Sequence, residues 1–84
     1  MPAPQNFEPY WHLILADMRR RIASGEWPPG HKLPATEELR QMYDELFGAR
    51  SNTHVRRAIK ELVGIGELRT HPGAGVWVIG PKKP

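Results

Sequence analysis

The sequence contains no cysteine and no long hydrophobic run. Without cysteine, the 84-residue chain can form neither disulfides nor thiolate metal sites, so a thin hydrophobic core must hold the fold. No apolar stretch approaches the ~18–20 residues needed to cross a bilayer, and the N-terminus lacks the basic and apolar regions of a secretory signal. These absences argue against secretion, membrane insertion, zinc-finger folding and cysteine catalysis. We expect a small soluble domain located in the cytoplasm.

The pattern of a catalytic or cofactor site is also missing. The four histidines are scattered without the spacing of metal ligands, and no Ser/His/Asp order or phosphate-cradling loop is present. The Gly-x-Gly at 73–75 stands alone and does not make a nucleotide-binding fingerprint. We therefore predict that the chain is not an enzyme and that it carries no metal or cofactor.

The distribution of charge says more than the net charge of +3. Between Arg50 and Lys60 there are four basic residues and no acidic one, and residues 19–21 are three consecutive arginines. A basic stretch of this kind is either a solvated helix face or a nucleic-acid contact, and its position in the fold must decide between them.

One folded domain is expected between residues 10 and 79. Residues 1–9 hold three prolines and residues 80–84 read GPKKP, so we expect a flexible N-terminal arm and a C-terminal tail or linker. The spacing of apolar residues predicts a first helix over 10–24, with Trp11 on its inner face and Gly25 after its end. The proline-rich stretch 26–34 should form a tight loop.

Two more helices are expected to follow. Thr36 is the expected N-cap of a helix ending before Gly48, and Ser51 that of a helix over 52–63. The second helix should bury one face: Leu39, Met42, Tyr43, Leu46 and Phe47. The third should bury Val55, Ala58, Ile59 and Leu62.

Two short strands, 67–70 and 76–79, should enclose the glycine-rich turn 71–75 as a hairpin. Three helices followed by a two-stranded wing make a mostly helical α+β fold, a winged helix-turn-helix.

Three segments of the chain carry a resemblance to a known family. They are IASGEWPPGHKLP (22–34), SNTHVRRAIKEL (51–62) and GELRTHPGAGVWV (66–78), in this order. Together they resemble the N-terminal DNA-binding domain of GntR-family transcriptional regulators. The resemblance covers roughly residues 9–79 and implies sequence-specific binding of double-stranded DNA, with helix 51–63 in the major groove and wing 69–76 on the minor groove or backbone.

The chain departs from the family pattern in two ways. Between Pro34 and Val55 it is about five residues longer, and four of these would add close to one helical turn. Two arginines that often contact DNA in the family are replaced, because Ala35-Thr36-Glu37 stands where Ser-Glu-Arg is common and Asn52 stands after the recognition-helix serine. The roles of those arginines cannot be transferred to this chain.

The start of the third helix would supply the major-groove contacts. Ser51 and Thr53 suit phosphate oxygens, although Ser51 also suits a plain N-cap. Asn52 could pair with adenine, and Arg56 resembles the family arginine that reaches bases, with guanine as its natural target. For Arg57, phosphate contact and a solvated role are equally open, and His54 could gain a phosphate partner when protonated.

The wing would supply the second set of contacts. Gly73 and Gly75 allow the backbone to approach the DNA closely, although a tight hairpin alone would require glycine. The family resemblance places His71 at the wing tip in the minor groove. Arg69 and, in the loop before the second helix, Lys32 are candidates for phosphate contact.

Two other functions remain open at this stage, namely a protein-docking winged helix and the binding of structured RNA. Regulators of the family usually continue into an effector-binding and dimerising domain, for which this chain has no sequence. A homodimer on a two-fold operator is expected if the chain dimerises.

Overall fold

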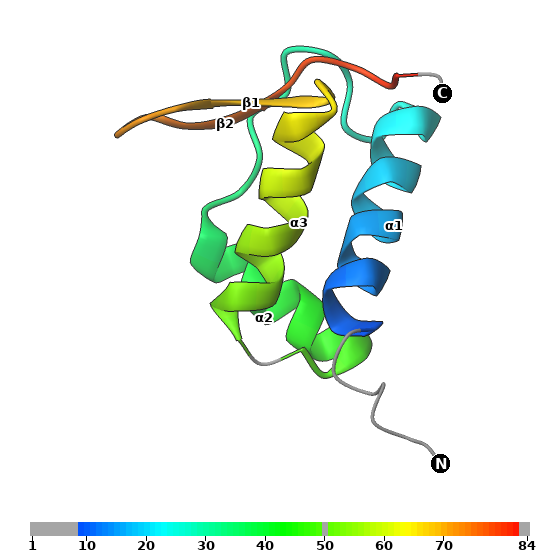
Figure 1. The fold of residues 1–84 in the computed structure, drawn as a ribbon, viewed down its shortest axis with the longest axis vertical. Coiled ribbons are helices and arrows are strands. Elements are labelled where there is room, and N and C mark those ends of the chain that lie inside the picture. Colours follow the sequence, from blue (N-terminus) through cyan, green and yellow to red (C-terminus); the bar gives the residue numbers. More distant parts are fainter. Residues whose placement is uncertain (1–8, 50, 83–84) are drawn as a thin grey trace.

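Three helices and a two-stranded hairpin follow one another in the order that the sequence predicts (Figure 1). The computed structural model describes residues 9–49 and 51–82, so the expected arm lies outside it except for Pro9, and Arg50 lies outside it too. The elements are α1 (Pro9–Ser24), α2 (Thr36–Phe47), α3 (Asn52–Gly64), β1 (Leu68–His71) and β2 (Gly75–Val78). The mostly helical α+β architecture is confirmed.

The helix boundaries follow their capping residues. Ser51 caps α3 as predicted, since its Oγ accepts a hydrogen bond from the Thr53 N–H at 3.0 Å. The prediction that Thr36 caps α2 was wrong by one residue, because Thr36 is already helical and Ala35 holds the N-cap position. Ala35 has no side chain that could cap the helix, but the Glu38 carboxylate accepts a hydrogen bond from the Ala35 N–H at 3.3 Å. At the other end, Gly48 closes α2 in the left-handed conformation, with φ at 79°.

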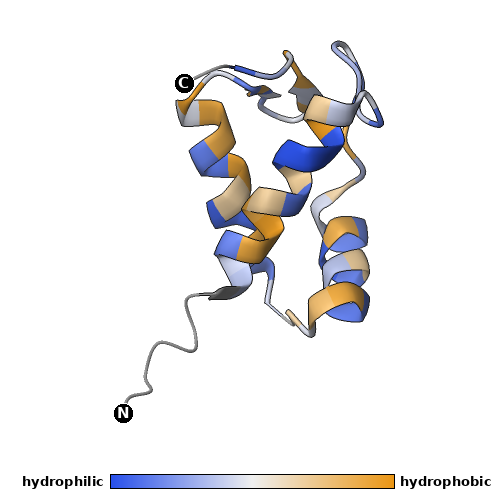
Figure 2. Ribbon diagram, turned by 90° about the vertical axis from the view of Figure 1, so that its right-hand side faces the viewer, coloured by the Kyte–Doolittle hydropathy of each residue, from blue (hydrophilic) through white to orange (hydrophobic). Residues whose placement is uncertain are grey.

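Helices α1 and α3 lie side by side, and α2 lies across them at the end where α1 begins (Figure 1). Each helix carries both hydrophobic and hydrophilic residues along its length, as amphipathic helices do (Figure 2). Their apolar faces meet in one core that includes Ile14, Met18, Leu39, Tyr43, Val55, Ala58 and Leu62. None of the described helices is long and apolar enough to span a bilayer.

Two predictions about buried faces were wrong. Leu46 was expected in the core, but it is 51% exposed, while Leu39 and Tyr43 of the same helix are buried. Trp11 is only half-buried, and its ring packs against the Arg57 guanidinium rather than against the core. In contrast Trp27, in the proline-rich loop after α1, is 6% exposed and belongs to the core.

The hairpin is antiparallel, and each of its strands lies one residue closer to the turn than predicted. Leu68 pairs with Val78 and His71 pairs with Gly75, so the turn holds only residues 72–74 and His71 lies in the strand instead of at the tip. The wing therefore spans 68–78, and α3 runs to Gly64, one residue beyond its predicted end.

The loop between α1 and α2 adds a third row of backbone pairing to this sheet. In that loop, residues 30–33 lie along the free edge of β2. The Gly30 N–H donates to the Val78 carbonyl at 2.8 Å and the Leu33 N–H to the Val76 carbonyl at 2.9 Å. In return, the Val78 N–H donates to the His31 carbonyl at 2.8 Å. We call residues 30–33 the strap, because they fasten the hairpin to the helical body.

A buried carboxylate joins α1 to α2. Asp17 accepts hydrogen bonds from the Tyr43 hydroxyl at 2.9 Å and from the Arg20 and Arg21 guanidinium groups at 2.6 Å each. Burial by itself raises the pKa of the Asp17 carboxyl, but the hydrogen bonds from Arg21, Arg20 and Tyr43 outweigh it, and the pKa is lowered overall. Burial and the hydrogen bond to Asp17 raise the pKa of the Tyr43 hydroxyl, which therefore stays protonated and donates.

A second buried carboxylate fixes the chain after the wing. Glu67 is 2% exposed and accepts hydrogen bonds from the Arg19 guanidinium at 2.9 Å and from the Lys82 backbone N–H at 3.1 Å. The first residues of the expected tail thus lie against α1 (Figure 1).

Replacement of Asp17 by asparagine should remove the charge from the α1–α2 junction and destabilise the fold by about 2 kcal/mol, since hydrogen bonds to a charged group are the strong ones. The folded-state pKa lies below the ordinary value, so Asp17 stabilises the fold above that value and the effect is lost as pH falls through the folded-state pKa. Urea unfolding across pH 2–7 should show a flatter acid limb for Asp17→Asn, with exposed Glu45→Gln as the control. An unchanged acid limb in Asp17→Asn would contradict this assignment.

Candidate nucleic-acid interface

A shallow groove of about 300 Å³ lies where α3, the wing and the start of α2 meet. In Figure 1 the wing projects from the end of α3 on the side away from α1, so this face is open. The groove is lined by Thr36 of α2, by Thr70 and Val76 of the wing, and by Arg56, Ile59, Lys60 and Val63 of α3. Segments far apart in the sequence therefore form one continuous surface.

The outer face of α3 supplies the positive charge of this surface. Residues 55, 58, 59 and 62 point into the core, which leaves Thr53, Arg56 and Lys60 exposed. Within residues 9–49 and 51–82, neither Arg56 nor Lys60 forms an ion pair, so both cations face solvent. Lys60 was missed as a site residue, although its position four residues after Arg56 on the same helix face could have indicated it.

Two of the predicted contact residues lie on the opposite flank of α3. Arg57 donates a hydrogen bond from Nε to Glu61 at 3.3 Å, and its guanidinium lies 4.2 Å from the centre of the Trp11 ring. The His54 ring lies 5.3 Å from the Tyr10 ring. Both side chains are thus turned toward α1 and are partly engaged there, which sets them apart from Arg56.

The first residues of α3 lie beside the first turn of α2. Glu37 of α2 accepts two hydrogen bonds from Arg40, at 2.7 and 3.1 Å. These bonds lower the pKa of the Glu37 carboxyl most, and hydrogen bonding with the Asn52 side chain lowers it further. Within the described residues, the Oδ1 atom of Asn52 is buried and without a partner. The Asn52 oxygen is thus enclosed by the protein, whereas pairing with adenine would need it exposed in the groove.

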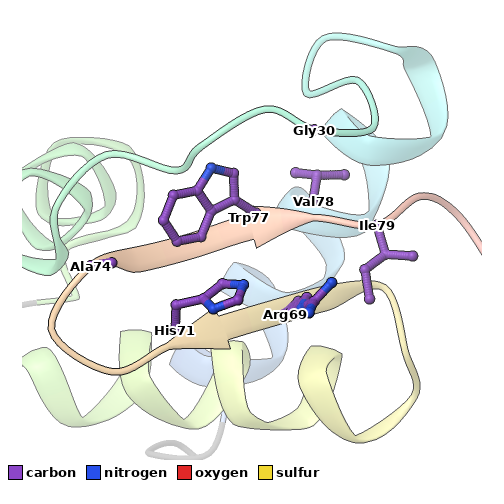
Figure 3. Close-up of a pocket in the computed structure, with 7 residues that line it drawn as sticks. All are labelled: Gly30, Arg69, His71, Ala74, Trp77, Val78 and Ile79. Carbon is purple, nitrogen blue, oxygen red and sulfur yellow. The ribbon is translucent and has the colours of Figure 1, made fainter.

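The two faces of the wing have different neighbours. Alternation along the strands puts Thr70 and Val76 on the face toward α3, and Arg69, His71 and Trp77 on the other face. Figure 3 shows these last three side chains around a hollow of about 650 Å³, where the His71 ring meets Trp77 edge-on at 5.2 Å. The predicted wing residues Arg69 and His71 thus lie together, but on the face turned away from α3.

Lys32 of the strap crosses this outer face. Its ammonium lies 5.4 Å from the centre of the Trp77 ring, a cation–π contact. The Lys32 stem passes over Gly75, where an added Cβ would lie 2.7 Å from Lys32 Cε. Gly75 also has φ at +141°, a conformation that other residues rarely adopt. Two observations therefore require glycine at this position, whereas Gly73 is required only by its φ of +77°.

The variant Gly75→Ala should displace Lys32 from Trp77 and destabilise the fold by about 1–3 kcal/mol, because of backbone strain and the clash. Gly73→Ala is the matched control: it introduces the same methyl group where nothing lies within 4 Å. In NMR spectra of the wild type, the Trp77 ring should shift the Lys32 methylene signals. These chemical shifts should return toward those of an unstructured lysine in Gly75→Ala but not in Gly73→Ala. Equal shifts in both variants would show that the close approach of Lys32 to Gly75 has no such effect.

Comparison with known proteins places this arrangement in a family. Residues 13–78 match the family model described as bacterial regulatory proteins, gntR family. The chain is 36% identical over 63 residues to a histidine utilization repressor of Pseudomonas putida, covering 75% of this chain and 23% of the repressor. It is 35% identical over 74 residues to the HTH-type transcriptional repressor NagR of Bacillus subtilis (strain 168), covering 88% of this chain and 28% of that protein. The chain thus spans about a quarter of the length of these curated relatives.

Solved structures agree with the family match. The crystal structure of the AraR DNA-binding domain in complex with operator ORE1 is similar to this chain with a TM-score of 0.75 and 30% sequence identity, over 93% of both chains. A GntR family transcriptional regulator from Listeria monocytogenes, at 23% identity and a TM-score of 0.76 over 89% of this chain and 61% of its own, supports the fold alone. The resemblance seen in the sequence is confirmed, and the chain belongs to the gntR family of bacterial regulatory proteins as a winged helix-turn-helix DNA-binding domain.

Proposed function

We propose that this domain binds an operator as part of a bacterial transcription regulator, with α3 in the major groove and the wing on the neighbouring minor groove or backbone. The observation that carries this proposal is the continuous surface formed by α3, the wing and the start of α2, from which Arg56 and Lys60 project. An α-helix fits the major groove of B-DNA, and exposed cations on that helix meet either base edges or phosphates. The site of action would be the cytoplasm, on promoter DNA.

The proposed DNA contact of each residue on α3 follows from its position on the helix. Arg56, on the groove side, is placed to read a base, and guanine offers the two acceptors that its guanidinium matches. Thr53 is exposed one turn earlier and suits a phosphate. Ser51 can combine both of its expected roles, because its oxygen accepts the capping bond while its hydroxyl hydrogen is free to donate.

The remaining α3 candidates would take secondary roles. Arg57 would contact a phosphate only by leaving Glu61 and Trp11, so we assign it a smaller contribution than Arg56. His54 lies beside Tyr10 at the edge of the surface and would touch DNA only where the backbone curves past α1.

The wing would contribute from its outer face and its tip. Arg69, His71 and Lys32 surround Trp77 there, and two cations beside an imidazole suit the sugar-phosphate backbone along the minor groove. Gly73 in the turn would let the backbone approach closely. A single domain offers few contacts, so we also propose that the full regulator dimerises on a two-fold operator, with half-sites about one helical turn apart.

Fluorescence anisotropy on a random-sequence duplex pool, measured across a salt series, tests the proposed function. Binding should weaken as salt rises, with a slope of about −0.9 in log K against log[salt] for each phosphate neutralised. Selection from the same pool should then enrich one operator sequence. Absence of duplex binding at low salt would overturn the proposal and favour protein docking or RNA binding by the same surface.

The variant Arg56→Ala should weaken binding to the selected operator by about 1–3 kcal/mol and relax the base preference at one position. Arg57→Ala is the matched control, because it removes the same side chain one residue away, on the flank that faces α1. It should cause a smaller loss that is equal on all sequences. A uniform loss on all sequences for Arg56→Ala would make Arg56 a phosphate contact.

A further inference from the structure

A carboxylate lies at the edge of the proposed DNA surface. Glu37 belongs to the first turn of α2, next to Thr36, which lines the same groove as Arg56 and Lys60. Its side chain is 57% exposed. A negative charge at this position repels phosphates, so its presence beside the two free cations of α3 needs a chemical reason.

Capping of α2 does not supply that reason. The neighbouring Glu38 accepts the hydrogen bond from the Ala35 N–H at the start of the helix, so Glu37 is not used there. The exposed ion pair of Glu37 with Arg40, three residues further along α2, contributes little to stability, as solvent-exposed pairs do. The place of Glu37 in the first turn also suits the positive end of the α2 dipole. That interaction does not engage a particular oxygen, so the carboxylate can still accept a hydrogen bond from another partner.

Arg40 fixes the orientation of this carboxylate. Both of its hydrogen bonds, from Nε at 3.1 Å and from the terminal nitrogen at 2.7 Å, end on Oε2 of Glu37. Oε1 is thus left outside the ion pair. Asn52, the first residue of α3, also lowers the pKa of the Glu37 carboxyl through hydrogen bonding, although less than Arg40 does. The carboxylate thus lies near the start of α3 as well as at the start of α2.

We propose that Glu37 is a specificity determinant that accepts a hydrogen bond from the N4 amino group of a cytosine in the major groove, with Arg40 as its positioning residue. A carboxylate only accepts hydrogen bonds. Among the four bases, cytosine presents only a donor on its major-groove edge, whereas guanine and thymine present acceptors and adenine presents an acceptor beside its amino group. This inference rests on the proposed placement of the helices on DNA.

Operator selection with the wild-type chain and with Glu37→Gln tests the proposal. The substitution keeps the shape of the side chain but adds donors, which tolerate the acceptors of the other bases. The wild-type chain should select cytosine at one position of the half-site and bind about tenfold more weakly when that cytosine is replaced. Glu37→Gln should lose this preference at that position alone.

Glu45→Gln provides the matched control, because it removes the same charge from an exposed residue in the last turn of α2. It should leave the base preference unchanged at every position. Arg40→Ala should weaken the preference for cytosine at the same position as Glu37→Gln, although it removes a positive charge where Glu37→Gln removes a negative one. Thermal unfolding of each variant should stay close to that of the wild type.

Three results would overturn the proposal. If Glu37→Gln binds all sequences more tightly by the same factor, the carboxylate only repels phosphates. If the selected half-site holds no cytosine whose preference depends on Glu37, the base assignment is wrong, while the proposed function stands. If the wild-type chain binds no duplex at all, the proposed function fails and the inference fails with it.

Discussion

Backbone pairing between the strap and β2 is the constraint on which the proposed DNA surface depends. A two-stranded hairpin is marginally stable alone in water, and β1 and β2 have only four residues each. The strap provides a third row of hydrogen bonds along β2, from residues that precede α2 in the chain. This pairing fixes the wing relative to the start of α2, and the groove between them exists only because both are held by the same segment.

The strap also determines what each face of the wing can do. Leu33 is buried beneath the sheet as part of the core, while Lys32, next to it, lies over Trp77 on the outer face. Since neighbouring residues in an extended segment point to opposite sides, one short stretch both anchors the wing and places a cation on it. Gly75 leaves the space through which the Lys32 stem passes.

In the helical body, two buried carboxylates join neighbouring elements, as the strap joins the wing to the rest of the domain. Asp17 joins α1 to Tyr43 of α2, and Glu67 joins the start of the wing to Arg19 of α1. Both lie within or against α1, which contributes little to the open groove. Helix α1 thus acts as a scaffold: its charged residues hold the other elements in place, and the side of α3 that it covers is the side where Arg57 and His54 are engaged.

The order of the elements, and their limits to within one residue, follow from the sequence alone. The apolar spacing of α1, the Ser51 cap and the glycines at 25 and 48 are local signals, and a local signal acts through residues only a few positions away. The errors had two origins. Whether Thr36 or Ala35 caps α2 depends on the local reach of Glu38, whereas the exposure of Leu46 depends on tertiary packing.

Which of the candidate residues share a surface depends on the tertiary structure. Arg56 and Arg57 are neighbours in the sequence, but they lie about 100° apart around α3, and the packing of α1 on one flank leaves Arg56 in the groove and Arg57 against Trp11. Arg69 and His71 were identified from sequence as wing residues, but the face of the wing on which they lie is set by how the hairpin packs against α3 and the strap. The network of Glu37, Arg40 and Asn52 joins two helices, and contacts between distant segments are set by how the helices pack rather than by any local pattern of residues.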